Sequence, residues 1–439
     1  MFRAIIKQLW NRKRSNISVA IELVCVFCLV WYIVDYLFVF AYNCNIPNTR
    51  DIRHTWKVNF GIFPEGTPQY SAEEDEPEAL LANFNRLLQI LNNYPGVEAV
   101  GVCDLGSTPE TGYINGERFR SATDTACLAW GQNIALLPTE DFFRVFGYTS
   151  GEGQVAVSTS DFDWSGANPA VLSRSMAQAL FPDGNAMGRE FCPVRNASMI
   201  YRVVGVIDDI KRFEFQRVQM AYYLPLRLTA DVLSRDGEWS IRNLVIMVRS
   251  KASIPDNVFR EAFRKEMTDA LQIGNFYLKS IVSFSKIKDD TTAEFGIANA
   301  IRVRIYLMAF FLLNILLCVM GTFWYRINLR RSEIGLRKAL GSTSRNIRNL
   351  FFLEGLILLA AAAIMAMVVE LQFVKADLIE TLGQDRSDLT VYLPDQTALR
   401  FLITNAITAA ILATVILAAI WLPAKRAASV PPVEALRDE

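Results

Sequence analysis

The stretch IYLMAFFLLNILLCVMGTFWY, residues 305–325, has 21 residues and no charged side chain. A helix needs about 20 mostly apolar residues to cross a bilayer, and uncharged runs of this length are rare in the cores of soluble proteins. Three further runs are long enough and carry at most one charge each: residues 17–34, 350–369 and 401–422. The sequence therefore predicts a four-helix transmembrane bundle.

The run at residues 17–34 needs a second test, because an apolar stretch near an N-terminus is also typical of a cleaved signal peptide. No small-residue pattern of the Ala-x-Ala kind follows it, and the run continues past Asp35 to Tyr42. We therefore interpret residues 17–42 as a retained membrane helix with room for a stalk beyond the bilayer.

The charges that flank these runs predict the orientation of the chain. Residues 1–14 carry five Lys and Arg and no acid, and residues 326–349 carry seven against one acid, Glu333. Residues 370–398 carry two basic and six acidic side chains. Because cytoplasmic loops are enriched in Lys and Arg, we expect both termini and residues 326–349 in the cytoplasm.

A large extracytoplasmic domain is then inserted between the first and second spans. The complete division of the chain is a basic N-terminus (1–16), the first helix (17–42), the outer domain (43–304), the second helix (305–325), a basic cytoplasmic segment (326–349), the third helix (350–369), a short outer loop (370–398), the fourth helix (399–422) and a cytoplasmic tail (423–439).

The outer domain reads as mixed α and β. Apolar residues recur at helical spacing over residues 80–91, and Pro95-Gly96 ends that helix before a strand at residues 97–103. Residues 201–207 and 244–248 are short runs rich in β-branched residues, which favours buried strands. Asp256 is the expected N-cap of a further helix, whose expected inward residues are Val258, Phe259, Phe263, Met267 and Leu271.

Composition and motifs argue against catalysis by this chain. Of 439 residues 45 are Lys or Arg, 45 are Asp or Glu and one is His, so neither a basic nucleic-acid-binding surface nor a His-based site is expected. The motifs G-x-x-x-x-G-K-[ST] and G-x-S-x-G do not occur, so we expect neither ATP hydrolysis nor a serine hydrolase. We assign no catalytic, cofactor-binding or metal-binding residue.

Two sets of residues leave alternatives open. The pairs Asp161/Asp163 and Asp208/Asp209 are expected to lie in turns and strand ends, with a cation site as the alternative. Four cysteines are expected outside the membrane, where they either form disulfides, in one of three pairings, or remain buried thiols: Cys44, Cys103, Cys127 and Cys192.

Two acidic residues lie within predicted spans, Glu22 and Glu354. Acids at membrane depth are candidates for a functional role, while side chains that snorkel to the interface are the alternative. The stripes Ala362-x-x-x-Ala366 and Ala406-x-x-x-Ala410 fit close packing between helices.

The segment RRSEIGLRKALGSTSRNIRNLFFLEG, residues 330–355, predicts a short helix between two spans. Glu333 and Arg337 have the i, i+4 spacing of a helical ion pair, and Gly341 is a typical helix stop. Residues 342–344 offer N-caps for the next helix. Ile334 and Leu340 are apolar residues in a basic segment, so we expect either lipid or a partner to cover them.

This segment resembles the FtsX-like ABC-transporter permease family of the MacB type, which has the pattern R-x-x-E-I-G-[IL]-R-K-A-[LM]-G followed by a Glu early in the third span. The matching residues here are Arg330, Glu333, Ile334, Gly335, Leu336, Arg337, Lys338, Ala339, Leu340 and Gly341, with Glu354 following. The chain end is similar to the family's P-A-x-x-A…P-x-x-A-L-R ending at Pro423-Ala424, Ala427 and residues 432–437. Residues 94–98, 172–188 and 201–207 resemble the MacB-type periplasmic domain. Glu22 is unusual, because small or amide residues are more typical at its position.

The resemblance implies a permease subunit of the bacterial inner membrane, in a homo- or heterodimer, with ATP and Mg²⁺ bound by a separate ABC ATP-binding subunit. Residues 330–341 would be the coupling helix that touches this subunit. ATP-driven closure would move the periplasmic domain by mechanotransmission and so drive export or extrusion, with a periplasmic adaptor and an outer-membrane channel as further candidate partners besides membrane lipid. The alternative is a non-transporting regulator that activates periplasmic cell-wall hydrolases.

Overall fold

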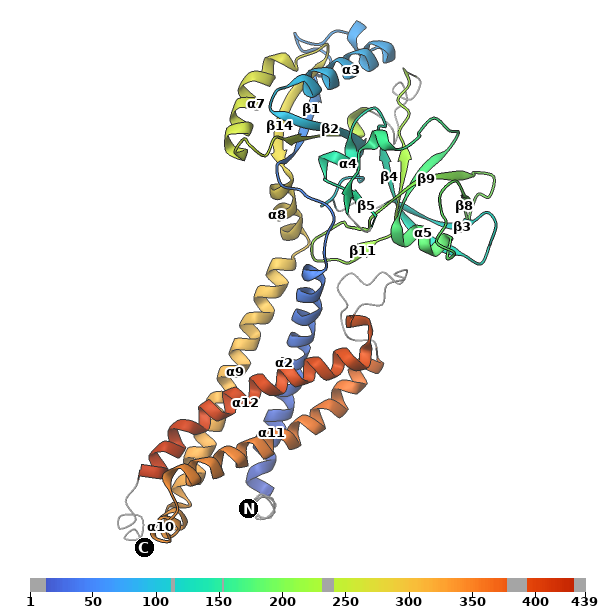
Figure 1. The fold of residues 1–439 in the computed structure, drawn as a ribbon. Helices are drawn as coiled ribbons and strands as arrows, with labels where there is room; N and C mark the ends of the chain where they lie inside the picture. The colour runs from blue at the N-terminus through green and yellow to red at the C-terminus, as the bar shows by residue number, and fades with distance from the viewer. Residues whose placement is uncertain (1–12, 112–114, 152–153, 231–240, 377–392, 430–439) are drawn as a thin grey trace. The chain divides into compact units, whose positions relative to one another are not determined.

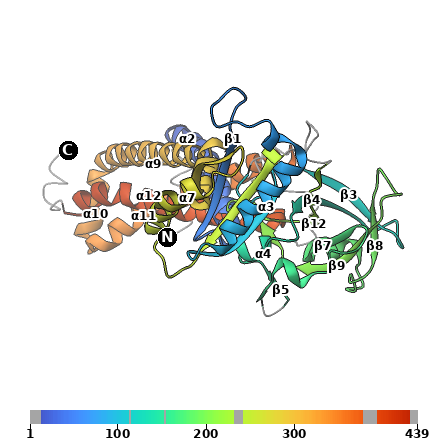
Figure 2. The same cartoon turned by 90° about the horizontal axis from the view of Figure 1, so that it is seen from above.

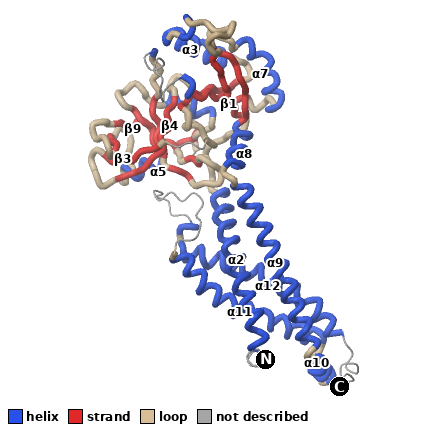
Figure 3. Tube along the Cα trace, turned by 180° about the vertical axis from the view of Figure 1, so that it is seen from behind, coloured by secondary structure: helices blue, strands red, loops and turns tan. Residues whose placement is uncertain are grey.

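The structure is a computed structural model that describes residues 13–111, 115–151, 154–230, 241–376 and 393–429. It divides into two compact units. The helical unit comprises residues 1–42, 297–382 and 391–439, and the α/β unit comprises residues 43–296 and 383–390. Figure 3 shows the strands in the α/β unit and the long helices in the helical unit.

Among the described residues, four helices of the helical unit are long and apolar enough to cross a membrane. They are α2 (Lys13–Asn45), α9 (Ile297–Asn328), α11 (Ser344–Lys375) and α12 (Thr397–Ser429), and the short helix α10 (Arg331–Ala339) lies between α9 and α11. Buried Val, Leu, Ile, Phe and Ala side chains of these helices form one continuous apolar core. The four apolar runs of the sequence therefore correspond to four helices.

The helices extend beyond the apolar runs that predict them. Helix α9 begins at Ile297, so residues 297–304 are helical and belong to the helical unit, whereas the sequence boundary at residue 304 places them in the outer domain. Helix α11 continues to Lys375, past the predicted end at residue 369. An apolar run marks the part of a helix that suits hydrocarbon, and a helix can continue into polar residues on either side.

The α/β unit contains a ten-stranded sheet with the order β12-β7-β9-β8-β3-β4-β2-β13-β1-β14, and two small two-stranded sheets. The strands are β1 (Thr55–Ile62), β2 (Val97–Asp104), β3 (Gly116–Ser121), β4 (Leu128–Leu136), β5 (Thr149–Ser150), β6 (Val155–Ala156), β7 (Pro169–Ser173), β8 (Glu190–Pro193), β9 (Tyr201–Ile207), β10 (Ile210–Lys211), β11 (Val218–Gln219), β12 (Ala221–Pro225), β13 (Leu244–Ser250) and β14 (Phe276–Ser283). The helices are α3 (Pro77–Asn93), α4 (Phe142–Val145), α5 (Arg174–Leu180), α7 (Asp256–Ala270) and α8 (Phe284–Glu294).

One half of this sheet has the split-βαβ topology. Strands β14, β1, β13 and β2 pair antiparallel in that order, with α3 between β1 and β2 in the chain and α7 between β13 and β14. Apolar faces of α3 and α7 pack on these strands around Trp56, Phe84 and Phe259. The remaining strands are inserted in the chain between β2 and β13.

The other half closes on itself. Strands β12, β7, β9, β8, β3 and β4 follow one another, and β12 also pairs in parallel with β4, from Ala221↔Gln132 to Pro225↔Leu136. Figure 2 shows these strands grouped together, while β1 lies with α3 and α7. Because the ring closes, these strands form a small barrel whose interior is filled by side chains such as Phe119, Leu172 and Phe191.

The local predictions for this unit hold with two exceptions. Helix α3 and strands β2, β9 and β13 cover the predicted helix and strands. Asp256 is the first residue of α7 and not its N-cap, which is Pro255, and its carboxylate pairs with His54 Nδ1 at 2.7 Å. Val258 was expected inward but is exposed, because α7 turns Phe259 and Phe263 toward the sheet.

Candidate functional site

The segment between α9 and α11 has the helix boundaries that its sequence predicts. Helix α10 ends at Ala339 and is followed by Gly341 with φ +94°, a left-handed conformation that glycine adopts without a steric penalty. The next helix is capped by Thr343, whose hydroxyl oxygen accepts a hydrogen bond from the Asn346 backbone N–H. Within α10, Arg337 Nη2 lies 2.6 Å from Glu333 Oε1, which confirms the predicted i, i+4 pair.

Glu354 is buried and joins three elements. Its side chain accepts hydrogen bonds from Arg330, at 2.9 Å between Nη1 and Oε2, and from Arg326, at 3.4 Å between Nη1 and Oε1. Arg326 belongs to the last turn of α9, Arg330 is the N-cap of α10, and Glu354 lies in α11. Glu354 is 3% exposed, so its carboxylate is held by the two guanidinium groups and does not reach solvent.

The residue after Glu354 brings two spans close together. A Cβ atom on Gly355 would lie 2.4 Å from Ile420 Cδ1 and 3.0 Å from Ile416 Cγ2, both in α12. A glycine at this position therefore permits α11 and α12 to approach closely beside the buried ion pairs.

Glu22, the second acid of the predicted spans, lies in a different part of the bundle. It is partly exposed in α2, and Cys318 of α9 donates a hydrogen bond from Sγ to Glu22 Oε2 at 2.7 Å. The structure therefore does not bring the two intramembrane acids together.

The apolar residues of α10 divide between the interior and the surface. Ile334 is 6% exposed and belongs to the apolar core that also contains Ile347 and Phe351. The expectation that lipid or a partner covers Ile334 is therefore wrong, because the protein covers it. Leu336 and Leu340 are 54% and 79% exposed. Leu336 and Leu340, the C-cap of α10, therefore lie on the exposed side of this helix.

A second buried polar cluster was not identified from the sequence. Arg400 of α12 pairs with Asp35 of α2, and both side chains are buried. Nearby, Trp31 Nε1 donates to Thr404 Oγ1 at 3.0 Å. Glu370, placed at the start of an outer loop by the sequence, is instead a fully buried residue of α11. The available signal was one charged residue directly beside each of two apolar runs: Asp35 follows residues 17–34 and Arg400 precedes residues 401–422.

The carboxylates considered for a cation have protein partners. Asp161 is part of a capping box with Ser158, and Asp163 accepts hydrogen bonds from Ser165. Asp208 pairs with Arg174 and accepts from Thr149, while Asp209 accepts from the backbone N–H and hydroxyl of Ser175. These contacts agree with turn and strand-end roles. All seven cysteines lie in the described residues and are free thiols, with Cys103 and Cys192 buried.

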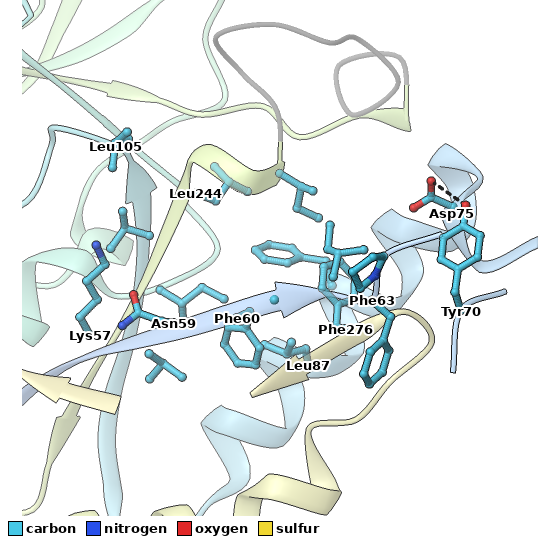
Figure 4. A pocket seen from close by; sticks show the side chains of 18 of the residues that line it. Lys57, Asn59, Phe60, Phe63, Tyr70, Asp75, Leu87, Leu105, Leu244 and Phe276 are labelled. Carbon is cyan, nitrogen blue, oxygen red and sulfur yellow. Dashed lines mark hydrogen bonds between the residues drawn. The ribbon is translucent and has the colours of Figure 1, made fainter. Parts of the chain in front are cut away.

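The α/β unit contains a pocket of about 530 Å³ beside β1. Figure 4 shows Phe60, Phe63 and Phe276 around it, with Tyr70 hydrogen-bonded to Asp75 at 3.3 Å. Apolar residues of α3 and β13 complete the lining of the pocket. Lys57 also lines the pocket, and burial lowers the pKa of its amine. Its size and lining are typical of small-molecule pockets, although the described residues around it present no catalytic arrangement.

Two protein-family models match the chain. The model described as MacB-like periplasmic core domain matches residues 49–262, within the α/β unit. The model described as FtsX-like permease C-terminal matches residues 305–432, which include α10, Glu354 and most of the three helices α9, α11 and α12. Together the two models match most of the chain.

The chain is also similar to a curated protein. It is 24% identical over 307 residues to the macrolide export ATP-binding/permease protein MacB of Mannheimia succiniciproducens. The alignment covers 68% of this chain and 42% of that protein, so the chain spans less than half the length of this relative.

The chain also resembles two solved structures. One is a domain of a permease protein from Porphyromonas gingivalis, with a TM-score of 0.32 and 15% sequence identity. This match covers 53% of this chain and 91% of that chain. The periplasmic region of MacB from Actinobacillus actinomycetemcomitans has a TM-score of 0.31 and 16% identity over 54% of this chain and 92% of that chain.

Proposed function

Because this chain belongs to the FtsX-like permease family and carries a MacB-like periplasmic core domain, we propose that it is the transmembrane subunit of an ABC transporter driven by a separate ATP-binding subunit. The four apolar helices and the family together indicate a multi-pass protein of the inner membrane. The distribution of Lys and Arg supports a cytoplasmic position for α10 and both termini. ATP and Mg²⁺ would bind to the partner subunit.

The main support for this proposal is that one side of α10 is fixed to the membrane helices while the other side is exposed. Arg330 at the start of α10 is fixed to Glu354 of α11, and Ile334 packs into the apolar core. The opposite side of α10 exposes Leu336 and Leu340. A docking element needs such an arrangement, with one side fixed to the spans and the other available to a partner.

The connections of the chain suggest how force would travel. A partner that pushes on Leu336 and Leu340 moves α10, and the ion pairs of Glu354 carry this movement to the ends of α9 and α11. Helix α9 begins directly after the α/β unit in the chain, and α2 ends where that unit begins. We propose that ATP-driven closure of a dimer moves the α/β unit through these two helices, which is mechanotransmission.

Export or extrusion is the first candidate for the work done. The name of the curated relative, a macrolide export protein, supports it, although the two chains share 24% identity and the alignment covers 42% of the relative. In this proposal a periplasmic adaptor and an outer-membrane channel would complete the pathway.

Affinity purification of the full chain from its own membranes in mild detergent tests the proposal. We expect an ATP-binding subunit with a phosphate-binding loop and a second permease copy in the eluate, together with an adaptor or a channel protein. A cell-wall hydrolase in place of the adaptor would favour the regulator alternative. ATP hydrolysis by the chain when it is free of other proteins would contradict the assignment of hydrolysis to a partner.

A further inference from the structure

Arg212 of the α/β unit is a buried cation that lacks acceptors for most of its guanidinium group. The side chain is 3% exposed. Its Nε atom donates to the Thr111 carbonyl at 2.7 Å. Among the described residues, neither Nη1 nor Nη2 has a hydrogen-bond acceptor within reach. Its Cζ atom lies 5.7 Å from the centroid of the Phe213 ring. Buried donors without hydrogen-bond acceptors are unfavourable, so Nη1 and Nη2 call for an explanation.

Arg212 lines a small pocket to which polar side chains and the apolar residues Pro109, Ile134, Ile210 and Ala221 all contribute. Ser107, Thr108, Gln132, Tyr148 and Gln219 line the same pocket. Burial raises the pKa of Tyr148, so its hydroxyl stays protonated and can donate a hydrogen bond. The Ser107 oxygen accepts from the Ala135 backbone N–H at 3.1 Å, which leaves its hydroxyl proton available. Gln219 Oε1 is an acceptor in the wall, but the other groups favour a negative occupant.

The charges around the pocket add up to an excess of positive charge. Against the larger effect of burial, the negative charge of Glu110 raises the pKa of Arg212, but the Glu110 side chain forms an ion pair with Arg50. Arg50 also donates to the carbonyls of Lys211 and Arg212. Lys211 is buried too, and its Nζ donates to the carbonyls of Asn43 and Ile46. Burial lowers the pKa of Arg212 to about 10, which still leaves the group charged at neutral pH.

The size of the pocket limits what can fill it. About 10 Å³ is open to the centre of a water molecule, roughly the room that one water-sized atom needs. An oxyanion such as sulfate or a ligand carboxylate has several heavy atoms and does not fit without a rearrangement of the walls.

We propose that this pocket binds a monoatomic anion, chloride or bromide, on Nη1 and Nη2 of Arg212. The anion lowers the net charge of Arg50, Glu110, Lys211 and Arg212 from +2 to +1. Thr291 of α8 donates to the Glu110 carbonyl at 2.9 Å, so the cluster joins the start of the unit to α8, and the anion stabilises this junction. The inference does not depend on the transport proposal.

Thermal unfolding of the full chain in detergent, followed by tryptophan fluorescence, tests the site. Chloride or bromide replaces gluconate at constant ionic strength. The rise in Tm should saturate with anion concentration. At an anion concentration about five times the one that half-fills the site, we expect a rise of roughly 2–4 °C in the Tm of the wild type. Arg212→Gln should abolish the rise. Arg195→Gln, which changes an exposed arginine of the same unit, should retain it.

An unchanged Tm in the wild type, or an equal rise in Arg212→Gln, would overturn the proposal. If Arg212→Gln does not fold, crystals of the wild type in bromide decide the question. An anomalous peak within hydrogen-bond distance of the Arg212 Nη atoms supports the site, and a water molecule alone at that position refutes it.

Discussion

The Nη1 atom of Arg330 lies 2.9 Å from the Oε2 atom of Glu354, and both side chains are buried. Arg330 begins α10 and Glu354 lies in α11, so this ion pair fixes the short helix to a membrane span. Arg326 of α9 shares the same carboxylate. The end of one span, the start of α10 and the next span therefore meet at a single side chain.

Removal of this carboxylate should destabilise the helical unit. Glu354→Leu takes the carboxylate away from the buried Arg330 and removes one ion pair from Arg326, which typically costs about 3–5 kcal/mol. The triple variant Arg326→Met, Arg330→Met, Glu354→Leu removes all three charges and should recover much of that loss. Unfolding in detergent by denaturant measures both. A triple variant that is less stable than Glu354→Leu would show that the ion pairs themselves are the main source of stability.

Close packing at Gly355 should make this position sensitive to size. Gly355→Val places methyl groups against Ile416 and Ile420 and should cost about 1–3 kcal/mol. Gly321 of α9 is the matched control, because a Cβ atom added there would meet no atom of the described residues within 4 Å. Gly321→Ala should be neutral or stabilising by up to about 1 kcal/mol, since alanine favours helix. Equal melting temperatures for Gly355→Val and the wild type would argue against this packing.

The ion pair between Asp35 and Arg400 should behave as a coupled pair. Asp35→Leu leaves a buried arginine, and Arg400→Met leaves a buried carboxylate, so each alone should destabilise by about 3–5 kcal/mol. The double variant should lose clearly less than the sum of the two. Strict additivity in a double-mutant cycle would mean that the two side chains do not interact.

The thiols give a chemical test of the α/β unit. With all seven cysteines free, the denatured chain should take up seven maleimide groups without any reductant. Before denaturation Cys103 should not react, because it is fully buried and burial raises the pKa of its thiol well above its usual range. Mass spectrometry of the labelled chain counts the groups. Two cysteines that react only after reduction would reveal a disulfide.

The long elements of the fold are predictable because their signals are local. An uncharged run of membrane-spanning length at residues 305–325 has few interpretations, and the spacing of Leu80, Phe84, Leu87 and Leu91 fits one face of α3. The topology of the α/β unit is not predictable in this way. Strand β13 pairs directly with β2, as in Val245↔Cys103, although all the barrel strands lie between them in the chain. No local sequence pattern encodes a partner so distant in the chain.

The short helix α10 was predicted from the sequence, but its packing was not. The motif at residues 330–341 pointed to α10, and the spacing of Glu333 and Arg337 gave their ion pair. Which apolar residue of α10 faces the core depends on where α11 packs, so the sequence treated Ile334 and Leu340 alike although one is buried and the other exposed. In the same way, the partners of Glu354 depend on packing, because Arg326 comes from α9 and Arg330 from the start of α10.

The most direct test of the account compares two exposed leucines after substitution by the same charge. Leu340→Asp alters the exposed side of α10, and Leu128→Asp is the matched control in the α/β unit, where Leu128 is 51% exposed. Both variants are purified with the ATP-binding subunit, and its binding and its ATP hydrolysis are measured. If α10 is the coupling helix, Leu340→Asp weakens binding by roughly thirtyfold, the loss of one contact of about 2 kcal/mol, while Leu128→Asp behaves like the wild type. Binding and stimulation by Leu340→Asp at the wild-type level would contradict the role of α10 as the coupling helix.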